Sequence, residues 1–212
     1  MTSDQTQTTD LSLDTNEIQS AGDEVSFDYE KAQQGVRLLL ESIGENPHEG
    51  TLTETWNRRV PEALKTLSEG YREEGKPDLK TFHADNDDLV VKTGLPLYSL
   101  CEHHLLPYTG TAHVSYRPDK EVVGLSKLTR YVRWQSRRLT VQEQLTNDIA
   151  KGLAEDLGAE VVMVEISATH LCEAMRGIET QSETRTIAIH GGPTDEERQR
   201  FRDAINRTEK TQ

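Results

Sequence analysis

The feature that most limits how this chain can fold is an amphipathic segment that runs almost directly into an apolar one. Within residues 140–157, apolar side chains recur every four residues and a glycine follows, at Val141, Leu145, Ile149, Leu153, Leu157 and Gly158. This spacing predicts a helix with one buried face and a glycine stop. Residues 161–169 then read VVMVEISAT, which predicts a strand.

Three further segments predict strands, because Val, Leu, Ile, Thr or Tyr dominate between turn residues. They are residues 89–100, 111–116 and 184–190. The fold class expected is α+β, with an antiparallel four-stranded sheet, flanking helices and an N-terminal helical segment.

Helices are expected to flank this sheet. Residues 126–138 form a short basic helix, and residues 194–207 a polar one that begins with a capping box of Thr194 and Glu197. Near the N-terminus, Ser26 can cap a first helix. A second helical pattern contains Pro61, so it is either two helical pieces or one kinked helix.

The net charge of the chain limits the classes of partner that it is expected to bind. The 212 residues include 24 Lys and Arg against 37 Asp and Glu, a formal net charge of −13. Such a surface repels nucleic acid and anionic membranes, so neither is an expected partner, and an anionic ligand needs a local cationic pocket. The acidic excess also suggests an adaptation to high salt.

The N-terminal residues 1–25 contain no Lys or Arg and no apolar block, so they do not resemble a secretory signal. Their composition predicts a disordered acidic tail. The sequence contains no apolar run long enough to cross a bilayer, and we expect a cytoplasmic protein with reduced cysteines.

Two distant segments carry the residue types that bind metal ions. Residues 99–104 read SLCEHH, and residues 170–172 read HLC. On a helical turn Cys101 and His104 share a face, whereas His103 points elsewhere. Continuing the alternation of the preceding strand would align His170 with Cys172.

A site with two thiolates and one imidazole leaves zinc one position for water, which is typical of a catalytic centre. The alternative is that both cysteines are core thiols, that His103 and His104 are solvated, and that His170 simply ends a strand. We favour the metal, because the alternative requires separate explanations for residues that occur together.

A possible anion site lies at residues 124–130, which read GLSKLTR. At a helix start, free backbone N–H groups favour phosphate, and Ser126, Lys127 and Arg130 add side-chain donors. Ser126 could instead be only an N-cap. Arg133, Arg137 and Arg138 continue the basic run, but such residues are more often a solvated helix face.

Three other residues admit two interpretations. The Glu143 carboxylate could accept hydrogen bonds from the N–H edge of guanine, with Gln142 beside it offering a donor and an acceptor. Thr140 and Glu143 would equally form a capping box. Arg176, four residues beyond Cys172, could bring a cation to a substrate or form a surface salt bridge.

Taken together and in this order, the motifs SLCEHH, GLSKLTR, VQE and HLCEAMRG closely resemble the GTP cyclohydrolase I family. The resemblance covers roughly residues 44–192. It departs from the family pattern at residues 54–60, where the chain reads ETWNRRV and its proline is displaced to Pro61.

The resemblance implies the tunnelling fold, a homodecamer with active sites at subunit interfaces, and one Zn²⁺ per subunit. It implies GTP as substrate, with hydrolysis at C8 of the purine, release of formate, and rearrangement of the ribose to give 7,8-dihydroneopterin triphosphate. This product begins folate, biopterin and deazapurine tRNA nucleoside biosynthesis. The implied division of the chain is residues 26–212 as one domain, with a helical part at 26–75, a catalytic part at 89–192 and a final helix at 194–207.

Residue roles follow from the same resemblance. Cys101, His104 and Cys172 match the zinc ligands, and His103 and His170 the catalytic imidazoles, one of which protonates N7 of the purine. The residues that match the guanine-holding pair are Gln142 and Glu143. Those that match positions around the ribose and triphosphate are Ser126, Lys127, Arg130 and Arg176.

Overall fold

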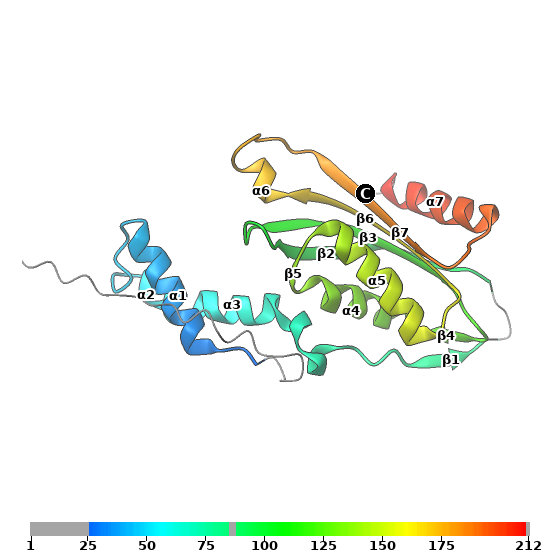
Figure 1. Cartoon of the computed structure of the whole chain (residues 1–212), viewed down its shortest axis with the longest axis horizontal. Coiled ribbons are helices and arrows are strands. Elements are labelled where there is room, and N and C mark those ends of the chain that lie inside the picture. The colour runs from blue at the N-terminus through cyan, green and yellow to red at the C-terminus, as the bar shows by residue number, and fades with distance from the viewer. Residues whose placement is uncertain (1–25, 85–87, 211–212) are drawn as a thin grey trace, which may run out of the picture.

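A five-stranded sheet forms the centre of the computed structural model, which describes residues 26–84 and 88–210 (Figure 1). Its strand order is β5-β2-β3-β6-β7. The strand bounds are β2 (Val90–Cys101), β3 (Pro107–Arg117), β5 (Leu139–Thr140), β6 (Val161–His170) and β7 (Glu183–His190). A separate two-stranded sheet pairs β1 (Thr81–His83) with β4 (Glu121–Val123).

The direction of the strands decides which chain segments meet. Strands β2 and β6 are each antiparallel to β3, and therefore run parallel to one another. Their carboxyl ends lie at the same edge of the sheet. The short strand β5 pairs in parallel with the end of β2, which brings the start of the following helix to that edge as well.

Helices cover both faces of the sheet. On one face, α4 (Leu125–Ser136) packs against β2, and α5 (Gln142–Leu157) packs against β6 and β7. Alternate β6 residues such as Val162, Val164 and Ile166 meet these helices in the main core. On the other face, Met163 packs against Phe201 and Ile205 of α7 (Asp195–Glu209).

The N-terminal helices lie beyond one edge of the sheet (Figure 1). They are α1 (Tyr29–Ser42), α2 (Leu52–Glu54), the π-helical segment η1 (Thr55–Arg59) and α3 (Val60–Leu67). Two 3₁₀ turns, η2 (Glu69–Tyr71) and η3 (Glu73–Gly75), follow them. Leu38, Leu39 and Ile43 of this region are largely exposed, at 57%, 66% and 74%.

Most of the predicted elements are confirmed. The amphipathic pattern forms α5 and ends at Gly158, which has a left-handed φ of +62°. The capping box at Thr194 and Glu197 begins α7. The α+β class with an antiparallel sheet and flanking helices is observed.

Two expectations need correction. The central sheet has a fifth strand, the parallel β5, and the β1–β4 pair was not predicted. Asp28, rather than Ser26, caps α1, since its side chain accepts a hydrogen bond from Lys31 N.

Of the two alternatives for the segment that contains Pro61, the structure supports a single helix. Segments α2, η1 and α3 are continuous, and the backbone widens into a π-helical segment just before the proline.

The predicted tail at residues 1–25 lies outside the described residues. The division of the chain into one domain with three parts stays a prediction. Within the described residues, no helix is both long and apolar enough to cross a membrane.

Candidate metal and substrate site

The carboxyl ends of β2 and β6 and the start of α5 bring the predicted catalytic residues to one edge of the sheet. Cys101 ends β2 and is followed by the turn that carries His103 and His104. His170 ends β6, and Cys172 lies in the short helix α6 (Leu171–Ala174) immediately after it. Residues that are about 70 positions apart in sequence thus become neighbours.

One group of side chains is arranged to bind a metal ion. The ligand atoms of Cys101, His104 and Cys172 all lie within 4.8 Å of one another. The turn after β2 folds back because the amides of His104 and Leu105 both donate to the carbonyl of Cys101, at 3.3 and 2.8 Å. Leu105 has a φ of +56°, which tightens this turn.

Both histidines of the turn approach Cys101, but only one joins the group. Nδ1 lies 3.7 Å from Cys101 Sγ in His104 and 3.9 Å in His103. His104 alone of the two also lies close to Cys172. His103 extends outward, with its Nε2 3.8 Å from Glu102 and its side chain 60% exposed. This geometry supports His104 as the ligand.

The chemistry of the group fits zinc. Two thiols and one imidazole are donors that zinc prefers, and three protein ligands leave one position for water. Burial, and then the neighbouring Cys101 thiol, raise the pKa of the Cys172 thiol. A bound metal would favour the Cys172 thiolate and so oppose this shift.

The alignment of Cys172 with His170 by strand alternation is wrong. The strand ends at His170 and α6 begins with the next residue, so the two side chains leave the backbone from different elements. Cys172 reaches the metal group from α6. His170 instead turns towards α5.

His170 is held by two contacts. Its ring stacks on Tyr108, with centroids 4.5 Å apart and an interplanar angle of 12°. Its Nε2 lies 2.8 Å from Oε1 of Gln142. Burial lowers the pKa of His170, an effect that the negative charges of Glu143 and Glu173 partly oppose. A neutral imidazole therefore lies beside the metal group.

The capping-box interpretation of Glu143 is wrong. Helix α5 begins at Gln142 after Val141, without a side-chain cap. Thr140 belongs to β5, where its hydroxyl lies 2.9 Å from Ser99 Oγ and 2.5 Å from Tyr108 Oη. The exposed Glu143 carboxylate is thus free of that structural role, and its charge acts on His170.

Gln142 and Arg176 differ in exposure. Gln142 is only 1% exposed, and its amide is fully hydrogen-bonded within the protein. Arg176 is exposed just beyond α6, and its positive charge acts on the Cys172 thiol. It has no ion-pair partner in the described parts of the chain, so the salt-bridge alternative is not observed there.

The N-terminal end of α4 lies far from the metal group. The C-terminal end of α4 is near Cys101, because Ser99 Oγ donates to the carbonyl of Arg138. The N-terminal end is near Lys92, whose Nζ donates to the carbonyl of Leu125. Cys101 lies nine positions beyond Lys92 in β2, which at about 3.3 Å per position is roughly 30 Å.

Ser126 and Lys127, in the first turn of α4, therefore lie away from the metal group of their own subunit, and Arg130 lies in the middle of the helix. Ser126 is exposed in the first turn of α4, and it is not the N-cap, which is Gly124. Lys127 and Arg130 line a cavity of about 430 Å³ between α4 and the loop that includes Asp78.

Arg133 also lines this cavity, although its sequence context favoured a solvated helix face. Lys127, Arg130 and Arg133 recur every three residues and line the same cavity. None of the three has an ion-pair partner among residues 26–84 and 88–210, in a chain with a net charge of −13. The three-residue spacing is the signal that could have identified Arg133. Arg137, by contrast, forms an ion pair with Glu69, and the Arg138 guanidinium lies over the Trp134 ring.

Tyr108 and Thr140 were also missed. They fix the position of His170 and the start of α5, but nothing in their local sequence distinguishes them from ordinary strand residues.

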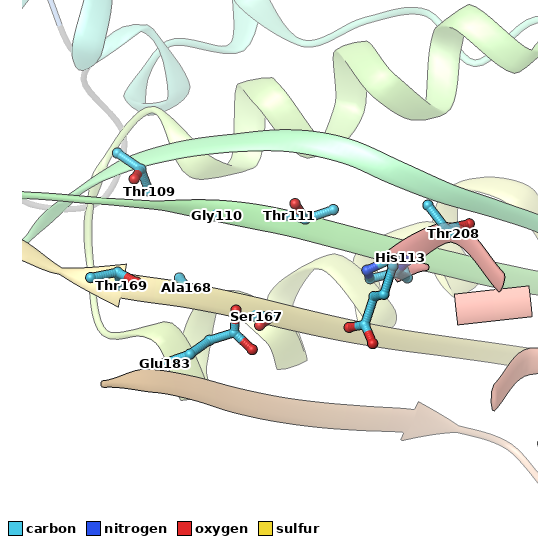
Figure 2. A pocket seen from close by; sticks show the side chains of 10 residues that line it. Thr109, Gly110, Thr111, His113, Ser167, Ala168, Thr169, Glu183 and Thr208 are labelled. Carbon is cyan, nitrogen blue, oxygen red and sulfur yellow. The ribbon is translucent and has the colours of Figure 1, made fainter. Parts of the chain in front are cut away.

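A further cavity, of about 170 Å³, lies between the strands and the end of α7 (Figure 2). Its lining includes His113, Ser167, Glu183 and Glu209, and none of the residues predicted for the site. Arg185 pairs with Glu165, Glu183 and Glu209, so this region connects β7 to α7 through ion pairs. It is separate from the metal group.

Sequence comparisons with known proteins give matches over most of the chain. The model of the GTP cyclohydrolase I family matches residues 32–207. A protein named GTP cyclohydrolase 1 from Campylobacter lari is 44% identical over 182 residues, covering 84% of this chain and 95% of its own length. Proteins of the same name from Hyperthermus butylicus and Pseudoalteromonas translucida are 45% and 39% identical, cover 78% and 76% of this chain, and are themselves covered over 83% and 88%.

Proposed function

The chain belongs to the GTP cyclohydrolase I family, and from this premise we propose that it hydrolyses GTP at a zinc ion held by Cys101, His104 and Cys172. GTP cyclohydrolase I activity is the first step of pterin biosynthesis. The observation that carries the proposal is the Cys–His–Cys group with two further imidazoles beside it.

The residues around the group provide what hydrolysis of a purine ring requires. When bound, zinc would supply Lewis acidity and lower the pKa of a coordinated water towards neutrality. His103 and His170 exchange protons with water and with N7 as addition of water to C8 breaks one of its two C–N bonds and opens the five-membered ring. A second water hydrolyses the remaining C–N bond, so that C8 leaves as formate, and the opened ribose rearranges and closes to give 7,8-dihydroneopterin triphosphate.

Guanine recognition is assigned to Glu143. Its carboxylate is exposed at the first turn of α5, beside His170, and takes no part in a helix cap. A carboxylate there can accept two hydrogen bonds from the N–H groups of guanine. The same edge of the sheet thus presents a base-binding group and the proton-transfer groups.

The triphosphate needs cations that this edge largely lacks. Arg176 is the cation beside Cys172, whereas Ser126 and Lys127 lie in the first turn of α4, and Arg130 and Arg133 line the same cavity as Lys127 further along the helix. We propose that these four residues reach the metal group of a neighbouring subunit. A homo-oligomer, which we take to be the family's decamer with one zinc ion per subunit, would then complete each site at an interface.

We infer the cellular environment of the enzyme from its two cysteines and its net charge. Both cysteines are free thiols, and their use as metal ligands fits a reducing, cytoplasmic environment. The product would serve folate, biopterin or deazapurine tRNA nucleoside biosynthesis. The net charge of −13 fits adaptation to high salt, which unfolding measured against KCl concentration tests.

The experiment that tests the function is incubation of zinc-loaded protein with GTP. We expect one formate per GTP consumed and, after oxidation, neopterin fluorescence. A pterin-binding or purine-binding protein with a structural zinc would bind GTP without forming formate, and that result would refute the proposed function.

A further inference from the structure

Gln142 is the most deeply buried of the residues that the family resemblance assigns to substrate binding. Its side chain leaves the first turn of α5 and runs inward between β6 and β7. It is 1% exposed, whereas its neighbour Glu143 is exposed. Its contacts therefore indicate its role more directly than its place in the motif does.

The orientation of the Gln142 amide is fixed by groups that can only accept hydrogen bonds. Nε2 lies 2.9 Å from the carbonyl of Thr184 and 3.1 Å from the carbonyl of Ile166. It also lies 3.1 Å from the hydroxyl of Thr186. Because backbone carbonyls cannot donate, the amide nitrogen must face them, and the amide oxygen must face His170.

This orientation determines where His170 carries its proton. Oε1 of Gln142 lies 2.8 Å from Nε2 of His170 and can only accept. Nε2 must therefore be protonated. In a neutral imidazole the other nitrogen, Nδ1, is then a proton acceptor.

The ring is also held in place. Tyr108 stacks on it at 4.5 Å, and the Tyr108 hydroxyl is 2.5 Å from Thr140 in β5. A half-turn flip of the imidazole would keep its stack on Tyr108 but would place a ring carbon at Gln142 and so lose the bond to Oε1. The tautomer and the orientation are thus set by the same small network.

We infer that Gln142 is a positioning residue that holds His170 in the Nε2–H tautomer, rather than a contact to guanine. This inference rests on the proposed function for its catalytic meaning. With Nε2–H held by Gln142, Nδ1 is the nitrogen through which His170 exchanges a proton during the reaction.

The tautomer can be measured without turnover. Magic-angle-spinning NMR of sedimented, zinc-loaded protein labelled with ¹⁵N-histidine should show His170 protonated at Nε2, with the signal assigned by its absence in His170→Ala. An Nδ1–H tautomer, or a mixture of the two, would overturn the inference. Because no GTP is present, this result is independent of whether the protein releases formate.

Kinetics separate positioning from guanine binding. Gln142→Met keeps the length of the side chain and removes both hydrogen-bonding groups. We expect kcat to fall by roughly a hundredfold or more, with the Kd for GTP unchanged. A raised Kd with kcat preserved would instead identify Gln142 as a guanine contact.

Two controls make this test specific. Thr186→Val removes one acceptor of the Gln142 amide but leaves both carbonyls, so it should keep nearly full activity. In a His170→Ala background, Gln142→Met should cause no further loss of kcat. A further loss would show that Gln142 acts independently of His170. If Gln142→Met does not fold, the NMR measurement on the wild-type protein still decides the question.

Discussion

At the scale of single residues, the site depends on which side chains take part in the metal group and which remain outside it. The motif spacing and the resemblance both selected Cys101, His104 and Cys172, and these three ligand atoms are the ones that come together. His103 and His170 lie beside the group in different ways, one exposed and one stacked on Tyr108. Zinc binding and turnover should therefore be separable by mutation.

Cys172→Ser should lose zinc and activity together, because it removes one of three ligands. His103→Ala should retain zinc and lose turnover by about a hundredfold or more, as expected for a lost proton-transfer group. Metal analysis of both purified variants, combined with formate release, checks this. A zinc-free His103→Ala protein would mean that the wrong histidine was assigned as a ligand.

Glu143→Ala should weaken GTP binding by about tenfold or more, because a charged group loses its hydrogen bonds to the base. Stability should change little, since the structure gives Glu143 no capping role. Calorimetric titration with GTP and thermal unfolding measure the two effects. Unfolding at a lower temperature, with an unchanged affinity for GTP, would instead show that Glu143 has a structural role.

The sequence could not show that Gln142 and Glu143 have different roles. Adjacent residues at a helix start carry similar polar groups, and only the three-dimensional packing against β6 and β7 buries one and exposes the other. Local capping preferences even suggested the wrong partner for Thr140, whose hydroxyl contacts Ser99 and Tyr108 instead.

At the scale of helices and strands, hydrophobic periodicity predicted the long elements well. It identified α5, whose buried face repeats over several turns, whereas α7 was predicted from its capping box and four of the strands from their residue types between turns. It could not identify β5, whose two residues form no pattern of their own and depend on pairing with the end of β2. Yet β5 is the element that places the start of α5 beside the metal group.

Helix α7 is joined to the sheet by an ion pair that should make the fold sensitive to acid. Arg117 donates to both oxygens of Glu197, at 2.8 Å each, and this contact chiefly lowers the pKa of Glu197 from 4.5 to about 2. A lowered folded-state pKa means that the stabilisation is present above about pH 4.5 and is lost as the pH falls towards 2.

Glu197→Gln tests this prediction, because glutamine can still cap the helix. At neutral pH the free energy of unfolding of the variant should be about 2 kcal/mol lower than that of the wild type. The difference should shrink as the pH falls from 4.5 towards 2. Denaturant unfolding across this range measures it, and a constant difference would exclude the ion pair as the cause.

At the scale of the whole molecule, the metal group and the N-terminal end of α4, which carries Ser126 and Lys127, lie at opposite ends of β2. The sequence placed both in one list of site residues, because a motif list does not show the direction in which α4 runs. The proposed contribution from a second copy would bring them together at one site.

Mixing two inactive variants tests this arrangement. Cys172→Ser should abolish the metal group, and Arg130→Ala should weaken triphosphate binding. If each site takes these residues from different subunits, random mixed oligomers should contain intact sites at about a quarter of the positions. Formate release measured after unfolding and refolding the two variants together should recover accordingly, and no recovery would mean that one subunit supplies both residues.

The most direct test of the central claim is a zinc titration of metal-free protein, followed by the rate of formate release from GTP. Activity should rise in proportion to added zinc and reach a plateau at one ion per subunit, while Cys172→Ser stays inactive at every zinc concentration. Metal-free protein that releases formate as fast as the reconstituted enzyme would contradict the assignment of GTP hydrolysis to the Cys101, His104 and Cys172 site.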